Sequence, residues 1–238
     1  MNKKWIIPDL HGCIKTLRHL VEEKIKPEKS DIIYFLGDYI DRGTNPKGVL
    51  DYVMWLESQG FDVKPLKGNH EEYLLLAIEE EKNLKRKNFF FREKNRLLAE
   101  WLDHGGGDTL LSFGVKKINQ IPEKYRDWIS KLKNYYLEEK YVIVHAGLNF
   151  SRKDPFDDVH AMLWARSFEV VPEKIGYRKI IHGHVPVSLE FMKACIETKD
   201  HKYLPLDNGC YLPNKPGMGN LVAYEINSST LLVQPNIE

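Results

Sequence analysis

The feature that most constrains this chain is a repeated pattern in which a short apolar run ends and acidic, histidine and glycine residues follow at once. Five such clusters occur: Asp9-Leu10-His11-Gly12, Gly37-Asp38-Tyr39-Ile40-Asp41-Arg42-Gly43, Gly68-Asn69-His70-Glu71, His145-Ala146-Gly147 and His182-Gly183-His184. In open α/β sheets, functional groups gather beyond the carboxyl ends of the strands, so we expect these clusters to converge on one rim. The glycines beside them permit tight turns and close approach of the backbone.

Apolar runs and amphipathic stretches alternate in the first part of the chain. Ile14, Leu17, Leu20 and Val21 recur at helical spacing, and a second helix is predicted over 49–56. Short strands are predicted at 5–7, 31–36, 63–66, 141–144, 179–181, 203–206, 221–224 and 231–233. The alternation of strand and helix predicts a layered fold of the α/β class.

Residues 71–135 follow a different pattern, which predicts a mainly helical insertion. Its helices are expected at 71–81, at 95–102 and after Pro122. The stretch 82–96 places lysines and arginines around Phe89-Phe90-Phe91. Basic and aromatic residues in this arrangement can bind nucleic acid or phosphopeptides, but we favour a solvated cap with the phenylalanines turned inward. A cap over the rim would be the expected source of substrate selectivity.

Composition narrows the class of protein. The 238 residues suit a single domain over 1–238, and a net charge of +1 gives no reason to expect nucleic acid as a partner. The three cysteines, Cys13, Cys195 and Cys210, are widely spaced, which argues against a disulfide framework and a thiolate zinc site. The first apolar run stops at Asp9, too early for a signal peptide, and no stretch is apolar enough to cross a membrane. We therefore expect a cytoplasmic protein.

The residue types in the clusters are those that bind borderline-hard divalent cations: carboxylates, imidazoles and an amide oxygen, without thiolates. Asp9 and His11 are two apart, so in an extended segment both point the same way. The proposed ligands are Asp9, His11, Asp38, Asn69, His145 and His184. Their two carboxylates oppose the four positive charges of two divalent ions, which leaves a positive site that attracts phosphate.

The ordered motifs resemble the phosphoprotein phosphatase family of metallophosphoesterases. The nearest branches are the bacterial and phage serine/threonine phosphatases and the symmetrical diadenosine tetraphosphate hydrolases. Leu163-Trp164-Ala165-Arg166 resembles the family's Trp-x-Arg element, and Asp207-Asn208-Gly209-Cys210 resembles its late Asp-x-Gly-Cys segment. The resemblance implies an αββα sandwich of two mixed β-sheets flanked by helices. The stretch 101–110, with its three consecutive glycines, also resembles an element of bacterial members, but no chemical role can be assigned to it.

The resemblance also implies a role for each cluster. Asp9, His11 and Asp38 would bind a first metal ion, and Asp38, Asn69, His145 and His184 a second. Manganese is the expected metal, with iron or zinc as alternatives. Phosphate would be bound by Arg42, Arg166 and Asn69. His70, paired with Asp41, would give a proton to the leaving group after a hydroxide shared by the two ions attacks phosphorus.

Several positions keep a second interpretation. His182 competes with His184 as the ligand, although the family's Gly-His pattern favours His184. Arg166 could be a surface residue stacked on an aromatic ring. Tyr39 is expected to pack or line the cleft, and Cys13 to be a small buried residue. The chain departs from the family at Pro8 and Ala146, without losing a functional group.

The leading hypothesis is a metal-dependent phosphatase that acts on phosphoserine or phosphothreonine in proteins. The alternative is a symmetrical hydrolase of bis(5'-nucleosyl) tetraphosphates, which would need the same metals but a different wall around the leaving group. A less favoured third hypothesis is an inactive phosphate-binding scaffold, which should have lost a ligand or the acid. The expected partners are therefore a phosphorylated protein or a small phosphoester, with no membrane. No oligomeric state is predicted.

Overall fold

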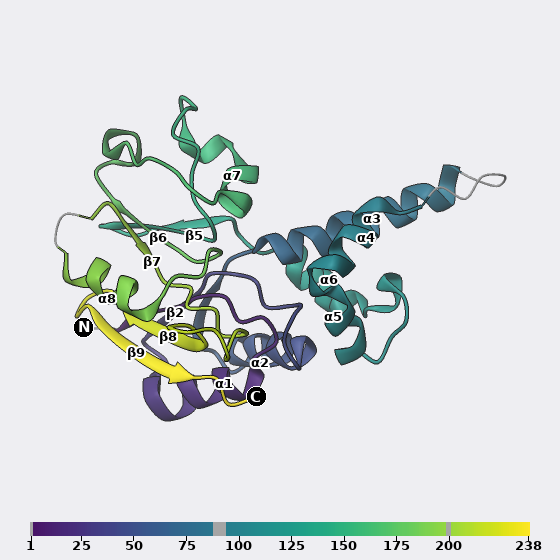
Figure 1. The fold of residues 1–238 in the computed structure, drawn as a ribbon, viewed down its shortest axis with the longest axis horizontal. Coiled ribbons are helices and arrows are strands. Elements are labelled where there is room, and N and C mark those ends of the chain that lie inside the picture. Colours follow the sequence, from purple (N-terminus) through teal and green to yellow (C-terminus); the bar gives the residue numbers. More distant parts are fainter. Residues whose placement is uncertain (1, 88–93, 199–200) are drawn as a thin grey trace.

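A computed structural model describes residues 2–87, 94–198 and 201–238 and contains two β-sheets (Figure 1). The first sheet has the order β3-β2-β1-β8-β9, and the second has the order β4-β5-β6-β7. The strands of the first are β1 (Lys4–Ile7), β2 (Ile32–Phe35), β3 (Asp62–Pro65), β8 (Asn220–Glu225) and β9 (Thr230–Pro235). Those of the second are β4 (Tyr135–Leu137), β5 (Tyr141–Val144), β6 (Lys179–His182) and β7 (Tyr203–Pro205).

Both sheets are mixed. β1, β2 and β3 run parallel, whereas β8 is antiparallel to β1 and to β9. In the second sheet β5, β6 and β7 run parallel, and β4 pairs with β5 in the antiparallel sense. The five polar clusters lie at the carboxyl ends of the parallel strands β1, β2, β3, β5 and β6. Each sheet has both parallel and antiparallel pairs, which confirms the predicted mixed-sheet class.

The alternation of side chains along the strands builds three apolar layers. Ile6 of β1 and Ile143 of β5 belong to the core between the two sheets. Ile7, the next residue along β1, points the other way, into the core that holds the helices α1 (Ile14–His19) and α2 (Pro46–Ser58). On the far side of the second sheet, Val142 belongs to the same core as Met162 of α7 (Val159–Trp164). The helix α8 (Leu189–Glu197) adds Met192 to the core between the sheets.

The predicted helical insertion is present over its described residues. Its helices are α3 (Asn69–Lys87), α4 (Arg96–Trp101), α5 (Gly107–Ser112) and α6 (Glu123–Ser130), with a short helical turn at Leu102–Gly106. In Figure 1 this helical segment extends from one end of the sandwich, with α3 as its longest member. The phenylalanines Phe89, Phe90 and Phe91 of the predicted cap lie outside the described residues. None of the helices in the described ranges has the length and apolar character that a bilayer crossing requires.

Candidate metal centre and active site

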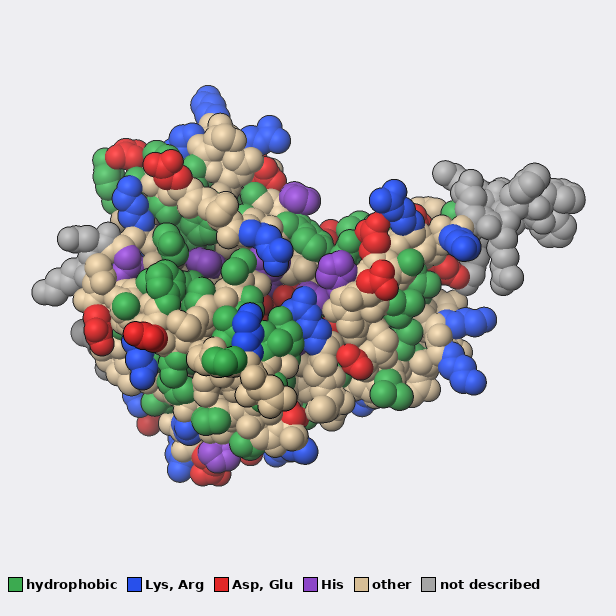
Figure 2. Space-filling model, in the orientation of Figure 1, with side chains coloured by type: hydrophobic (Ala, Val, Ile, Leu, Met, Phe, Trp, Pro, Cys, Tyr) green, Lys and Arg blue, Asp and Glu red, His purple; other side chains and the backbone are tan. Residues whose placement is uncertain are grey.

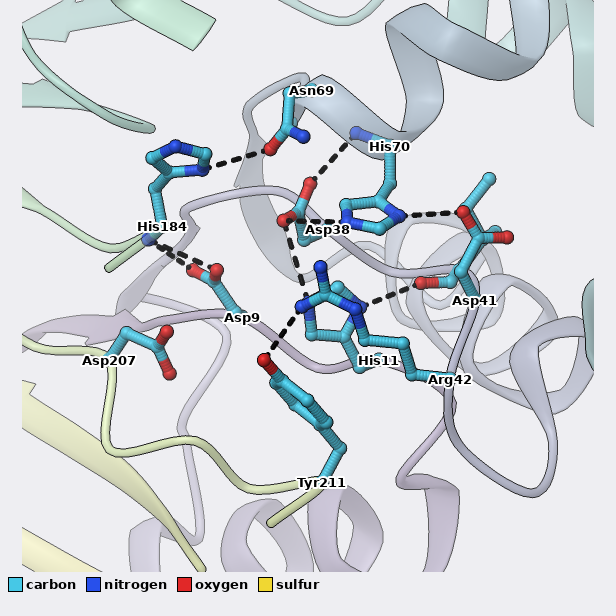
Figure 3. Close-up of polar contacts among 12 residues, drawn as sticks. Asp9, His11, Asp38, Asp41, Arg42, Asn69, His70, His184, Asp207 and Tyr211 are labelled. Carbon is cyan, nitrogen blue, oxygen red and sulfur yellow. Dashed lines mark hydrogen bonds and ion pairs between the residues drawn. The ribbon is translucent and has the colours of Figure 1, made fainter. Parts of the chain in front are cut away.

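The polar clusters converge where the parallel strands of both sheets end (Figure 3). Asp9 and His11 follow β1, Asp38 follows β2, His145 follows β5, and His184 follows β6. Asn69 is the first residue of α3, just after β3. Several residues in these loops have a positive φ angle, which costs free energy for residues other than glycine: His11, Asp38, Asp41, Arg42 and His184. Strained backbone of this kind gathers at functional sites.

The carboxylate of Asp38 is at the centre of the cluster, and its two oxygens face different histidines. Asp38 Oδ2 is 3.6 Å from His11 Nε2 and 4.0 Å from His70 Nε2. Asp38 Oδ1 is 3.6 Å from His145 Nε2 and accepts a hydrogen bond of 3.1 Å from the His70 backbone N–H. Burial raises the pKa of Asp38, but the neighbouring imidazoles, His145 foremost, outweigh this effect and lower it. Asp38 is therefore an anion shared by two groups of histidines.

Two of these imidazoles are oriented by backbone carbonyls. His11 Nδ1 lies 2.9 Å from the Ile40 carbonyl oxygen, and His145 Nδ1 lies 2.8 Å from that of Leu36. A carbonyl oxygen only accepts, so Nδ1 carries a proton in both rings, and Nε2 is turned toward the centre. Metal-binding histidines are held in this way by their other ring nitrogen.

His184 and Asn69 complete the second group. Asn69 Oδ1 lies 2.9 Å from His145 Nε2 and 3.0 Å from His184 Nδ1. Burial lowers the pKa of His184 to about 3, which keeps its imidazole neutral and able to bind a cation. Burial also lowers the pKa of His145.

The side chains fit divalent cations. Ligand atoms of His11, Asp38 and His70 lie within 4.8 Å of one another, and so do those of Asp38, His145 and His184. The carboxylates of Asp9, Asp38 and Asp207 are all buried at this cluster. The Oδ2 atom of Asp207 has no hydrogen-bond partner among the described residues. Burial raises the pKa of Asp207 to about 7. A crowd of buried carboxylates with an unsatisfied oxygen is stabilised when cations are added.

Asp9 lies beside the two groups of close ligand atoms. It is absent from both groups of close ligand atoms, and His70 joins His11 and Asp38 instead. Its two oxygens accept hydrogen bonds of 3.1 Å and 3.0 Å from the His184 backbone N–H. Burial, followed by the charges of Asp207 and Asp38, raises the pKa of Asp9. Figure 3 shows the Asp207 carboxylate beside that of Asp9. Asp9 thus borders the site together with Asp207, to which the sequence assigned no role.

His70 and Asp41 form a buried pair. His70 Nδ1 lies 2.7 Å from Asp41 Oδ2. Burial lowers the pKa of His70, but the charge of Asp38 and the hydrogen bond to Asp41 raise it more. The same Asp41 oxygen accepts a hydrogen bond of 2.9 Å from the indole Nε1 of Trp101. The proton on Nδ1 points at Asp41, so Nε2 of His70 faces the metal-binding cluster.

The two arginines differ in their contacts. A guanidinium nitrogen of Arg42 lies 2.9 Å from His11 Nε2 and donates a hydrogen bond of 2.8 Å to the Tyr211 hydroxyl. Its guanidinium also stacks 4.7 Å from the centre of the Tyr211 ring. Arg166 is exposed, and its charge adds to the burial that lowers the pKa of His184. In Figure 2 basic, acidic and histidine side chains meet at the base of the hollow beside the helical segment.

Glu71, the last residue of the third cluster, holds the loop after β2. Its carboxylate accepts hydrogen bonds from the backbone N–H groups of Asp38, Tyr39 and Gly68 at 2.9 Å each, and from that of Ile40 at 3.2 Å. Glu71 is fully buried. Its position directly after His70 is the only signal in the sequence that could have predicted this role.

His182 lies among aromatic side chains. Its ring centre is 5.4 Å from that of Phe168 and 5.7 Å from that of Tyr203. Tyr39 packs in the core and donates a hydrogen bond of 2.9 Å to the Leu66 carbonyl oxygen. Cys13 is buried with a free thiol. Tyr39 and Cys13 are therefore buried packing residues, as expected, and His182 is buried among these rings with no hydrogen-bond partner on its Nε2 in the described part of the chain.

The chain is similar to several known phosphatases. A symmetrical bis(5'-nucleosyl)-tetraphosphatase of Nitrosospira multiformis is 29% identical over 144 residues, which cover 60% of this chain and 43% of the relative. The chain thus spans less than half the length of that relative. A protein serine/threonine phosphatase of Saccharomyces cerevisiae has a TM-score of 0.64 at 15% identity and covers 100% of this chain and 81% of its own.

The cold-active protein-tyrosine phosphatase of a Shewanella species also has a TM-score of 0.64 at 15% identity, over 98% of this chain and 80% of its own. At such identities these two structures compare the fold alone. Residues 3–208 match the model of the calcineurin-like phosphoesterases. The chain therefore belongs to the calcineurin-like phosphoesterase family.

Proposed function

We propose that this protein hydrolyses phosphate esters with the help of two divalent metal ions. The observation that carries the proposal is the position of Asp38, whose two carboxylate oxygens face His11 and His145 at 3.6 Å each. A carboxylate between two sets of neutral imidazoles can serve two ions at once. When bound, the ions would supply positive charge opposite the phosphate and would acidify a water molecule near neutral pH.

The ligands in this proposal are those expected from the sequence: Asp9, His11, Asp38, Asn69, His145 and His184. The contacts support His11 and Asp38 on one side of the centre, and Asn69, His145 and His184 on the other. Asp9 would reach the first ion from the border of the site, with Asp207 as a further negative charge beside it. Manganese remains the proposed metal, with iron or zinc as alternatives.

Arg42 would bind the phosphate together with Arg166 and Asn69. The Arg42 guanidinium is held by Tyr211 and borders His11, so it is already at the cluster before a substrate arrives. A planar guanidinium can bind two oxygens of one phosphate at once. Arg166 is exposed and would come into contact with the anion from the solvent side.

His70 would donate the proton that the leaving oxygen requires. The hydrogen bond of 2.7 Å to Asp41 fixes the ring so that Nε2 faces the site. An alkoxide leaves poorly unless it is protonated, and a positioned acid typically contributes roughly 10²- to 10⁴-fold to such a step.

The proposed substrate is a phosphoserine or phosphothreonine side chain in a protein. The open hollow at the site supports this substrate, because it would admit a side chain carried by a folded partner (Figure 2). The name of the Nitrosospira relative favours a second candidate, a dinucleoside tetraphosphate. Assaying a phosphopeptide and diadenosine tetraphosphate side by side, with Mn²⁺ present, would separate the two. Strong turnover of the dinucleotide alone would refute the protein phosphatase, and turnover of neither would refute the proposed function.

A further inference from the structure

The glycine-rich stretch Trp101–Thr109 packs directly against the loop that carries Asp41 and Arg42. This stretch belongs to the helical segment, not to the strand ends that supply the polar clusters. Trp101 and Thr109 are both fully buried, as is Asp41. The contacts between them give this stretch a role that the sequence did not reveal.

Both oxygens of Asp41 accept a hydrogen bond from this stretch. Trp101 Nε1 donates to Asp41 Oδ2 at 2.9 Å, and Thr109 Oγ1 donates to Asp41 Oδ1 at 2.5 Å. The Asp41 backbone N–H in turn donates to Thr109 Oγ1 at 2.9 Å. Because the hydroxyl oxygen accepts this N–H, its own proton is directed at the carboxylate. Hydrogen bonds to an ionised acceptor in a buried site are among the strong ones.

The glycines allow this close packing. Gly105 has a φ of 103°, and a Cβ there would lie 2.9 Å from both the backbone nitrogen and the Cγ of Arg42. A Cβ on Gly106 would lie 2.4 Å from the indole ring of Trp101. Side chains at these two positions would push the stretch away from Asp41 and Arg42. The glycines therefore allow the close approach that the hydrogen bonds from Trp101 and Thr109 to Asp41 require.

We propose that Trp101 and Thr109 are positioning residues, which fix the orientation of His70 by donating hydrogen bonds to both oxygens of Asp41. We call these two hydrogen bonds to Asp41 the clamp. The inference rests on the proposed role of His70 as the proton donor. Asp41 Oδ2 is shared by His70 Nδ1 and Trp101 Nε1, while Oδ1 is fixed by Thr109. With both oxygens held, the carboxylate cannot rotate about its Cβ–Cγ bond, and the plane of the His70 ring is set. The helical segment thus affects the proposed protonation of the leaving group through Asp41, which is 68 residues from Thr109 in the sequence.

Thr109→Val tests the clamp, because it keeps the shape of the side chain and removes its hydroxyl. We expect kcat for a phosphoserine peptide to fall roughly 10- to 100-fold, the usual effect of losing an orienting partner. The kcat for p-nitrophenyl phosphate, whose leaving group needs no proton, should change little. Thr109→Ser should restore the peptide activity, since it keeps the hydroxyl.

A control and a second readout separate positioning from a general loss of structure. Ser112 lies on α5 with Thr109, and its hydroxyl bonds Lys47 N–H and Asn45, away from Asp41. Ser112→Ala should therefore leave the ratio of the two activities unchanged. The proton on His70 Nδ1, identified in the NMR spectrum by its loss in His70→Asn, should shift in Thr109→Val and return in Thr109→Ser.

Equal losses on both substrates in Thr109→Val, with an unchanged Nδ1 resonance, would overturn the clamp. If Thr109→Val does not fold, Trp101→Phe, which removes the Nε1 donor to Asp41 together with part of the buried ring, carries the same two measurements. A selective loss in His70→Asn without one in either clamp variant would refute this inference and leave the proposed function standing. A wild-type protein that hydrolyses neither substrate would refute the proposed function itself.

Discussion

The strand ends and the helical segment contribute to the site in different ways. The strand ends carry the side chains that face the centre, with Asp38 between His11 and His145. The helical segment carries Trp101 and Thr109, whose side chains donate hydrogen bonds to Asp41, one step removed from the centre. The comparison teaches that the strand ends and the first turn of α3 carry the proposed groups for cations and phosphate. The stretch from Trp101 to Thr109 instead holds Asp41, the partner of the proposed acid His70. Substitutions in the two regions should therefore have different kinetic signatures.

The largest expected effect is that of His70→Asn, which removes the proposed acid while the ligands on the strand ends remain. The kcat for a phosphoserine peptide should fall by roughly 10²- to 10⁴-fold, the contribution of general acid catalysis. The effect on p-nitrophenyl phosphate should be much smaller, because nitrophenolate leaves without a proton. Steady-state kinetics with both substrates checks this prediction, and equal losses would contradict the acid role.

A smaller effect should distinguish the two late histidines at the end of β6. His184 Nδ1 faces Asn69, whereas His182 packs with Phe168 and Tyr203. His184→Gln should weaken Mn²⁺ binding by at least the roughly 10- to 100-fold that an outer partner of a metal ligand contributes. His182→Gln should leave the Mn²⁺ affinity close to that of the wild type. Calorimetric titration of both variants with Mn²⁺ would measure the difference. A larger loss of affinity in His182→Gln than in His184→Gln would make His182 the ligand instead.

The smallest effect on catalysis should come from substitutions remote from the centre. There the two regions should differ in how much a substitution changes the free energy of unfolding. Ile6 is fully buried between the sheets, and Ile6→Ala should lower the free energy of unfolding by roughly 2–5 kcal/mol. Leu111, on α5 of the helical segment, is 78% exposed. Leu111→Ala should change the free energy of unfolding by no more than about 0.5 kcal/mol. Urea denaturation compares the variants, and similar losses would mean that the exposed face of α5 is covered in solution.

The strand ends could be predicted from the sequence because their signals are local. An apolar run followed by a cluster such as Gly68-Asn69-His70-Glu71 identifies both the strand and the group at its end. The same locality explains the prediction of an α/β fold and of a helical segment, whereas the two mixed sheets were expected from the family resemblance. The short strand β4 was missed, because its three residues are only partly buried or exposed and lack a clear alternation.

Long-range contacts explain what the sequence did not reveal at the site. Thr109 is 68 residues from Asp41, and no spacing rule connects them. Asp207 meets Asp9 only because β7 pairs beside β6 in the second sheet. The helix α8 was also missed, although Ser188 accepts a hydrogen bond from the Phe191 N–H and caps its first turn. That capping residue was a local signal available in the sequence.

The central claim is that Asp38 joins two cation sites in one centre. Calorimetric titration with Mn²⁺, together with metal analysis of the saturated protein, tests it most directly. The wild type should bind two equivalents per chain, and Asp38→Asn should lose high-affinity binding of both while keeping its fold by circular dichroism. Fewer than two equivalents in the saturated wild type, or undiminished binding in Asp38→Asn, would contradict the account.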